Sequence, residues 1–249
     1  MTQVDIRAKG SVLLESSKFS SDSNLNVWAD QDITFKGVSI VGASSDVSGK
    51  LSATSKSKSI YVNTNKAEME LLKNGNPLPD ANTLAAAPVK AATRTVMRAT
   101  AVHFTADDGD IFVNGVSFDR GNVASGSEFQ ARAKGTIGIY DSTINHAKAL
   151  IAANTVVLKD VTFGGNDVTL RSQTGFVAAR PGTGQAVAPG HVNFVSGVYY
   201  NSTEVRLPGM TNPQGQAGFL NAAANNHADY GGAKNFSGLK IQTLGGVTH

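Results

Sequence analysis

The stretch Phe129-Gln-Ala-Arg-Ala-Lys-Gly-Thr-Ile-Gly-Ile-Tyr-Asp-Ser-Thr-Ile144 contains the pattern that decides the fold. Apolar or small side chains alternate with polar ones over residues 129–133 and again over 137–139. Gly135 separates the two runs, and a second break precedes Ile144. Alternation with a period of two is typical of strands that bury one face. The stretch therefore predicts three short strands and two tight corners, which is one coil of a parallel β-solenoid.

Similar coils recur along the chain when the first residue of each second strand is numbered zero. The predicted zero positions are Val12, Ile33, Ile60, Ile111, Ile137, Val156 and Phe176. The +2 positions are Leu14, Phe35, Val62, Val113, Ile139, Leu158 and Ala178. The +7 positions are Phe19, Ile40, Ala67, Phe118, Ile144, Phe163 and Thr183. A base spacing of about 20 residues indicates a repeat architecture, and the period of two argues against a helical repeat.

The strand before position zero repeats as well. The predicted −6 residues are Ile6, Val27, Ala131 and Leu150, and the predicted −4 residues are Ala8, Ala29, Ala133 and Ala152. In the coils at Ile60 and Ile111 the corner is one residue longer, so that Ser55 and Ala106 take the place of the alanine. A recurrent alanine predicts an inner corner that has no room for a larger side chain.

We expect residues 1–249 to form a single all-β domain, a right-handed parallel β-helix of about seven to eight coils. Residues 64–101 depart from the template and predict a lateral insertion, with a short helix over 66–73. This insertion is either a passive surface loop or a contact arm. Residues 184–249 predict an irregular C-terminal region, and its strand over 238–244 either caps the solenoid or pairs with another chain.

Composition excludes several classes of function. The chain has 0 cysteines, which excludes disulfides, thiolate metal sites and cysteine catalysis. Its net charge of +3 comes from scattered basic residues, without the basic stripe and interleaved aromatics of a nucleic-acid interface. No apolar run approaches the roughly 20 residues of a membrane span. No signal peptide is visible, so the chain is either cytoplasmic or the mature form of a longer precursor.

The best candidate for chemistry is Asp107-Asp108-Gly109-Asp110. Paired carboxylates serve as acid and base or bind Ca²⁺, but Asp and Gly are also favoured in turns, and we interpret this segment as a corner. No two of His103, His146, His191, His227 and His249 have metal-ligand spacing. The sequence contains no Gly-x-Ser-x-Gly elbow and no phosphate-cradling glycine loop. We expect no catalytic residue, cofactor or metal.

Coils of the type Ala-Lys-Gly-Thr-Ile-Gly-Ile, at 133–139, and Leu-Lys-Asp-Val-Thr-Phe, at 158–163, resemble those of filamentous-haemagglutinin-type bacterial surface proteins. The resemblance covers roughly residues 4–63 and 102–183. It implies an extracellular or cell-surface protein with a structural or adhesive role and without catalytic residues. The insertion, the short length and the Gly/Asn-rich tail depart from that family.

We therefore expect a non-enzymatic structural protein, either a self-assembling fibre subunit or a cell-surface adhesin module. Its first coil starts at Val4 with no preceding segment to cover it, which predicts end-to-end association with further copies. A surface glycan or another surface protein is the other expected partner. The alternative function is a carbohydrate-active β-helix, either a polysaccharide-cleaving enzyme or a glycan-binding module. As an enzyme it requires a groove with convergent carboxylates.

Overall fold

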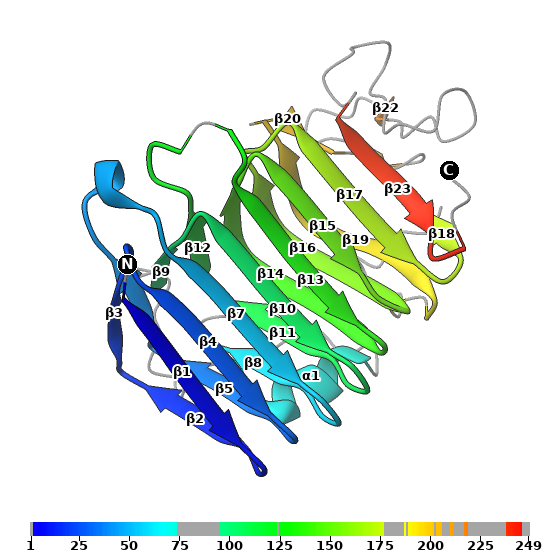
Figure 1. Cartoon of the computed structure of the whole chain (residues 1–249). Helices are drawn as coiled ribbons and strands as arrows, with labels where there is room; N and C mark the ends of the chain where they lie inside the picture. Colours follow the sequence, from blue (N-terminus) through cyan, green and yellow to red (C-terminus); the bar gives the residue numbers. More distant parts are fainter. Residues whose placement is uncertain are drawn as a thin grey trace.

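Two parallel β-sheets curl around a shared apolar core and give the chain an all-β fold (Figure 1). The computed structural model describes residues 2–73, 95–123, 125–176, 187, 189–201, 203–205, 210–211, 217–218 and 238–245. Every strand pair inside the two large sheets is parallel except the β19–β20 pair at one edge. The predicted all-β parallel class is therefore confirmed.

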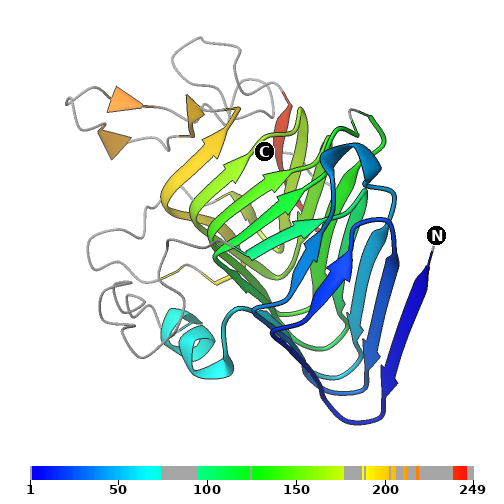
Figure 2. The ribbon, with the colours of Figure 1, turned by 90° about the vertical axis from the view of Figure 1, so that its left-hand side faces the viewer.

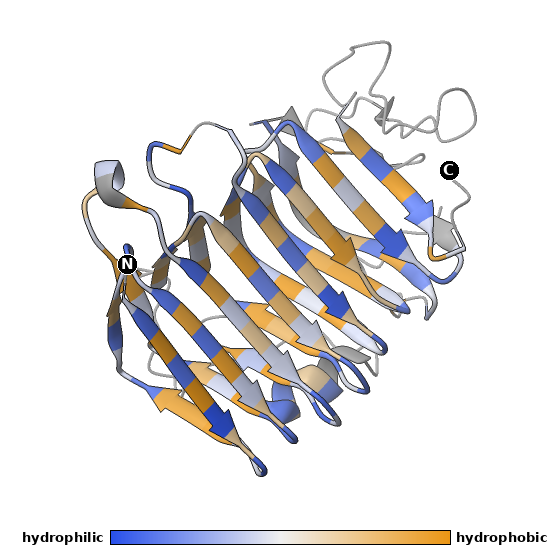
Figure 3. Cartoon of the chain, in the orientation of Figure 1, coloured by the Kyte–Doolittle hydropathy of each residue, from blue (hydrophilic) through white to orange (hydrophobic). Residues whose placement is uncertain are grey.

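The first sheet, called sheet A here, has eight strands. In spatial order they are β1 (Gln3–Ala8), β4 (Asn24–Ala29), β7 (Lys50–Ser55), β10 (Ala101–Ala106), β13 (Glu128–Ala133), β15 (Lys148–Ala152), β17 (Asp167–Ser172) and β23 (Leu239–Thr243). Apolar and polar residues alternate along these strands, which appears as stripes in Figure 3. The apolar stripe faces the core and the polar stripe faces outward.

The second sheet, sheet B, bends sharply and provides two walls. The first wall begins with β2 (Val12–Glu15), β5 (Ile33–Lys36), β8 (Ile60–Val62) and β11 (Ile111–Asn114). The second wall begins with β3 (Lys18–Ser20), β6 (Ser39–Val41), β9 (Thr95–Arg98) and β12 (Val116–Asp119). The longer strands β14 (Thr136–Asn145), β16 (Thr155–Phe163) and β19 (His191–Tyr200) run through both walls.

Short elements complete the described part of the chain. They are the 3-10 helix η1 (Ser44–Asp46), the helix α1 (Lys66–Lys73), and the strands β18 (Gly175–Phe176), β20 (Thr203–Glu204), β21 (Met210–Thr211) and β22 (Ala217–Gly218).

The predicted repeat positions pair with one another in the first wall. The zero positions from Val12 to Val156 stack in register, and the +2 positions from Leu14 to Leu158 do the same. The prediction for the last coil was wrong, because the residue that stacks on Val156 is Val192 of β19 and not Phe176. Phe176 pairs with Val192 along the other edge of β19. Residues 178 and 183, assigned to the same coil, lie outside the described residues.

One +7 assignment was also wrong. Met97 of β9 pairs with both Ile40 and Phe118, and it is fully buried, whereas Ala67 is an exposed residue of α1. The insertion enters after the second strand of this coil, so the third strand is formed by residues 95–98, inside the range 64–101 that was assigned to the insertion.

The first strands follow the prediction as far as Ala133. Ala8 pairs with Ala29, and Ser55 and Ala106 continue the stack to Ala133. The assignment of β15 was wrong by one residue. Ile151 pairs with Ala131 and is buried, while Leu150 faces outward and Ala152 pairs with Arg132. The corner after β15 is one residue shorter than the preceding one, and a slip of one residue exchanges the two faces of a strand.

The corner between the two walls explains a recurrent sequence feature. Its residues have left-handed backbone conformations, with φ between 39° and 63°: Ser16, Gly37, Asn63, Gly115, Asp141 and Asp160. Glycine adopts this conformation without strain, and Asn and Asp tolerate it better than other residues do. This requirement explains why Lys-Gly, Asn-Gly, Tyr-Asp and Lys-Asp precede the third strand of successive coils.

The predicted helix over residues 66–73 is confirmed as α1. Asn65 caps its start, because the Asn65 side chain accepts a hydrogen bond from the backbone N–H of Glu68 at 3.1 Å. Met69 of α1 is buried in an outer cluster on the first wall with Tyr61, Phe112, Tyr140 and Val157. The helical part of the insertion therefore covers an aromatic patch that the wall would otherwise expose.

The C-terminal strand β23 pairs with β17 of its own chain, with Leu239 opposite Val168 and Ile241 opposite Leu170. This strand is thus the last strand of sheet A in spatial order, at the opposite end of the sheet from β1.

Candidate binding face and open end

The outer face of sheet A carries rows of polar side chains. One row, aligned by the strand register, consists of Asp5, Asn26, Ser52, His103, Gln130, Leu150, Thr169 and Lys240. Neighbouring residues in a row are separated by the strand spacing of about 4.8 Å. Apart from Leu150, the row therefore presents hydrogen-bonding groups at regular intervals along the long axis of the sheet.

A hydrogen-bonded cluster lies near the middle of this face. His103 Nε2 lies 2.7 Å from Glu128 Oε1, and Gln130 Nε2 donates to Glu128 Oε2 at 3.2 Å. Partial burial acts to raise the pKa of Glu128, but the hydrogen bonds from His103 and Gln130 outweigh it and lower this pKa. Glu128 is thereby held in its charged form.

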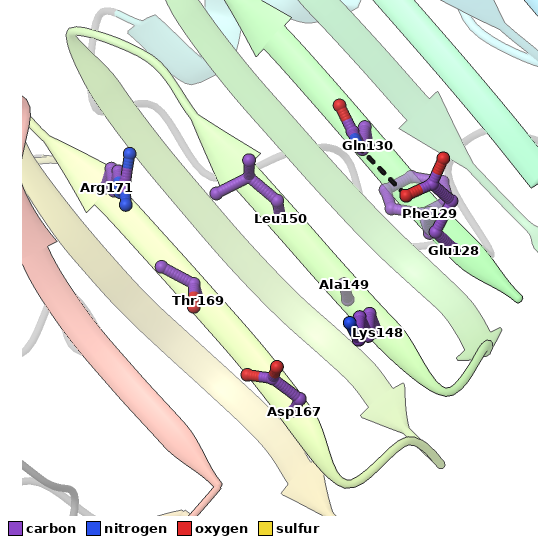
Figure 4. Close-up of a pocket in the computed structure, with 9 residues that line it drawn as sticks. All are labelled: Glu128, Phe129, Gln130, Lys148, Ala149, Leu150, Asp167, Thr169 and Arg171. Atoms are coloured by element: carbon purple, nitrogen blue, oxygen red, sulfur yellow. Dashed lines mark hydrogen bonds between the residues drawn. The ribbon is translucent and has the colours of Figure 1, made fainter. Parts of the chain in front are cut away.

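A shallow depression of about 200 Å³ adjoins this cluster, between β13 and β17 (Figure 4). Lys148 pairs with Glu128 on one side and with Asp167 on the other, so the two acids are separated by two strand spacings, about 10 Å. Lys240 Nζ lies 3.6 Å from Asp167 Oδ1. Each acid has a basic or imidazole neighbour, so negative and positive groups alternate along the depression. This arrangement suits the binding of a polar ligand better than catalysis by the two carboxylates as an acid–base pair.

A second depression, of about 330 Å³, surrounds Trp28 at the β1 end of the same face. Its lining includes Asp5, Arg7 and Asn26, and Asn26 Nδ2 donates to Asp5 Oδ1 at 2.9 Å. The hydrogen bonds from Asn26 and Gln3 lower the pKa of Asp5. The partly exposed indole of Trp28 therefore offers a flat apolar surface, and amide, carboxylate and guanidinium groups surround it.

Sequence reasoning missed both depressions. A signal for Trp28 was present, because Val27 was predicted to point inward and its neighbour must therefore point outward. The proximity of His103 to Glu128 depends on the register between β10 and β13, and the sequence pattern alone does not pair these two polar residues.

The β1 end of the molecule is open. Strands β1, β2 and β3 are the terminal strands of the sheets. The inward side chains of this layer, Val4, Ile6, Leu14 and Phe19, are only partly buried, and Leu13 is 60% exposed. Figure 2 looks onto this end. At the other end of sheet A, β23 is also a terminal strand, but its inward side chains Leu239 and Ile241 are 0% and 2% exposed and are therefore covered.

The acidic segment at 107–110 forms a corner. Asp110 Oδ1 accepts a hydrogen bond from the backbone N–H of Thr136 at 2.6 Å, and the Asp110 N–H donates to Ser59 Oγ at 3.1 Å. Asp108 Oδ1 lies 2.6 Å from Lys134 Nζ, an exposed pair that raises the pKa of Lys134. Within the described ranges, no group of three or more His, Cys, Asp or Glu side chains is placed to hold a metal ion.

Asp110 also explains a glycine of the fold-defining stretch. A Cβ atom on Gly135 would lie 2.2 Å from Asp110 Oδ1 and 3.0 Å from the Gly109 carbonyl oxygen. Only glycine fits where the two corners approach this closely.

The histidines have unrelated environments. His146 is fully buried and its Nε2 lies 3.0 Å from the Ala99 carbonyl oxygen, while its Nδ1 has no hydrogen-bond partner among the described residues. Burial lowers the pKa of His146 to about 4. His191 Nδ1 lies 2.8 Å from the Pro189 carbonyl oxygen. Residues 227 and 249 lie outside the described part of the chain.

Comparison of the chain with family models, curated protein sequences and solved structures finds no match. None of the helices in the described ranges has the length and apolar character needed to cross a bilayer.

Proposed function

We propose that this chain is a non-enzymatic structural module, a right-handed parallel β-helix of about seven to eight coils, which associates with further copies through its β1 end. The observation that carries the proposal is the open first layer. A location outside the cell, on a bacterial surface, rests on the resemblance of the coils to surface proteins.

The backbone of β1 supports association at this end. The carbonyl groups of Thr2 and Ala8 bond to β4, through the N–H groups of Asn24 and Asp30. Backbone groups alternate sides along a strand, so those of Gln3, Asp5 and Arg7 point to the free edge. An exposed strand edge is a template for pairing with another chain.

The apolar side chains beneath this edge add a driving force. Val4, Ile6, Leu14 and Phe19 contact the core but keep exposed area. Their counterparts one layer further in, Leu25, Val27, Phe35 and Ile40, are 0–3% exposed. Covering the first layer with another chain would remove the remaining apolar area from water, which stabilises a complex by about 25 cal/mol for each Å².

Analytical ultracentrifugation of the full chain over a wide concentration range tests this function. The wild type is expected to self-associate reversibly, and Ile6→Lys is expected to sediment as a folded monomer because it places a charge in the contact. Thr169→Lys, an outward substitution on β17, is the matched control and should associate like the wild type. A wild-type chain that stays monomeric at the highest concentration overturns the proposal.

A second candidate function, binding of a glycan, is favoured by the depression around Trp28. The flat indole suits the apolar face of a sugar ring, and Asp5, Asn26 and Arg7 supply hydrogen-bonding groups around it. Trp28 is the only tryptophan among the 249 residues, so its fluorescence reports on this site alone. Saturable fluorescence changes with oligosaccharides, lost in Asn26→Ala, support this function, and the absence of any response across neutral, acidic and basic sugars refutes it.

A further inference from the structure

We propose that the β1 end binds the same end of a second copy, with the two β1 strands antiparallel about a two-fold axis that passes Ile6. This inference rests on the proposed self-association and goes further, because it assigns the polarity, the register and the pairing residues of the contact.

The different burial of the inner side chains at the two ends of sheet A points to a contact between identical ends. Val4 and Ile6 of β1 keep exposed apolar area, whereas Leu239 and Ile241 of β23 are already covered. The apolar inner side chains of β1 are therefore incompletely buried along the whole strand, whereas the other incompletely buried inner positions among the described residues of sheet A, Ala133 and Thr243, lie singly at strand ends. A second copy matches this layer best by presenting the same layer, and such a self-complementary contact closes about a two-fold axis.

The alternation of side chains restricts the register. An antiparallel partner must place inward residues opposite inward residues, so that both cores stay continuous. With Ile6 opposite Ile6 of the second copy, Val4 lies opposite Ala8, and Asp5 lies opposite Arg7. The free backbone groups of Asp5 and Arg7 then face each other, and each such pair exchanges both N–H···O bonds.

Charge selects this register over its neighbours. A shift that places Asp5 on the axis puts the two Asp5 carboxylates opposite each other, and a shift that places Arg7 there puts the two guanidinium groups opposite each other. Like charges directly across a strand pair are destabilising, while opposite charges are favourable. The register centred on Ile6 gives an Asp5–Arg7 pair twice.

The rest of the layer is compatible with this geometry. A two-fold axis perpendicular to sheet A reverses the direction of β1 and exchanges the two walls of sheet B. The β2 edge of one copy then meets the β3 edge of the other, and the partly exposed Leu14 lies over the layer of Phe19. Each copy contributes both an aliphatic and an aromatic side chain to the contact.

Single-cysteine variants test the register, because the natural chain has 0 cysteines. Ile6→Cys is expected to form a disulfide-linked dimer under mild oxidation, since facing Cα atoms at a non-hydrogen-bonded antiparallel position are about 4.5 Å apart, within disulfide range. Gln3→Cys is the control on the same strand. In this register its thiols are about 20 Å apart and should not cross-link. Cross-linking through Asp5→Cys instead overturns the register.

A charge exchange provides an independent test in the absence of oxidation. Asp5→Arg or Arg7→Asp alone creates two like-charge pairs and is expected to weaken the dimer about tenfold or more. The double variant Asp5→Arg/Arg7→Asp restores opposite charges and should return the dissociation constant to within a few-fold of the wild type. A double variant as weak as the single variants refutes the proposed pairing.

The two proposals fail in different ways. A wild-type chain that remains monomeric by ultracentrifugation overturns both of them. A wild-type chain that associates, while Ile6→Cys does not cross-link and the charge exchange does not restore affinity, leaves the self-association standing and rejects the contact between identical ends.

Discussion

Acidification is expected to destabilise the fold through His146. The imidazole is fully buried, its Nε2 lies 3.0 Å from the Ala99 carbonyl oxygen, and its ring centroid lies 6.4 Å from that of Phe129. Burial disfavours the charged imidazolium and lowers the pKa of His146 from 6.5 to about 4. In the unfolded chain this histidine regains its ordinary pKa.

The direction in which stability changes with pH follows from proton binding. Between pH 6.5 and about 4 the unfolded chain binds a proton at residue 146 and the folded chain does not. Stability is therefore full above pH 6.5, falls as the pH decreases through this window and becomes constant below pH 4. Linkage gives a loss of about 2 kcal/mol at pH 5 and about 3 kcal/mol once both states are protonated. Such a loss is a large fraction of the stability of a typical domain.

Urea unfolding at several pH values, followed by far-UV circular dichroism, measures the effect. His146→Gln removes the titrating group and should flatten the decline of the unfolding free energy between pH 6.5 and 4.5. Ile144→Val, two residues before His146 and within β14, lowers stability without removing a histidine and should keep the wild-type slope. The reasoning is refuted if His146→Gln and the wild type show the same dependence on pH.

Two further comparisons test the core and the corner. Phe104 is fully buried, with ring centroids 6.2 Å from Phe35, 5.9 Å from Phe118 and 6.2 Å from Phe129. By urea unfolding, Phe104→Ala should cost about 3–5 kcal/mol, while the outward Thr105→Ala should cost less than about 0.5 kcal/mol; equal costs would contradict the inward orientation of Phe104. Asp110→Ala removes a buried acceptor and should cost about 1–3 kcal/mol, whereas the exposed Asp108→Asn should change stability by less than about 0.5 kcal/mol. A large effect of Asp108→Asn would contradict its interpretation as a surface turn residue.

The sequence predicts which side chains face the core wherever the apolar pattern allows only one choice of inward residues. Ile137 and Ile139 alternate within a strand that is followed by a glycine or aspartate corner, so their inward orientation follows from the period of two. At β15 the pattern has two solutions. Both Leu150 and Ile151 are apolar, and the choice between them depends on a corner that is one residue shorter, which composition does not reveal. Met97 was missed because the insertion separates it from the strand that precedes it in the coil.

The candidate surfaces were harder to predict, because they arise between layers. The outward orientation of Trp28 follows from the alternation in β4, but most of its polar surroundings come from β1 and β7. The approach of His103 to Glu128 needs the register of β10 against β13. The buried state of His146 depends on its place at the end of β14, where the chain turns toward β15. Each of these facts is a relation between strands that are about 20 residues or more apart in sequence.

The open first layer links association to stability. In a stack of layers each layer is stabilised by its neighbours, and a terminal layer has one neighbour instead of two. The layer of β1 therefore contributes less than an inner layer, and a second copy that pairs with it supplies the missing neighbour. By mass action the apparent stability of the fold should then rise with protein concentration. If the contact is restricted to the β1 ends, the mass should stop rising with concentration once dimers are formed, whereas the apparent stability of the dimer continues to rise. A fibre would require a second contact surface, and its mass would continue to rise with concentration, so the concentration dependence of the mass distinguishes a paired module from a fibre subunit.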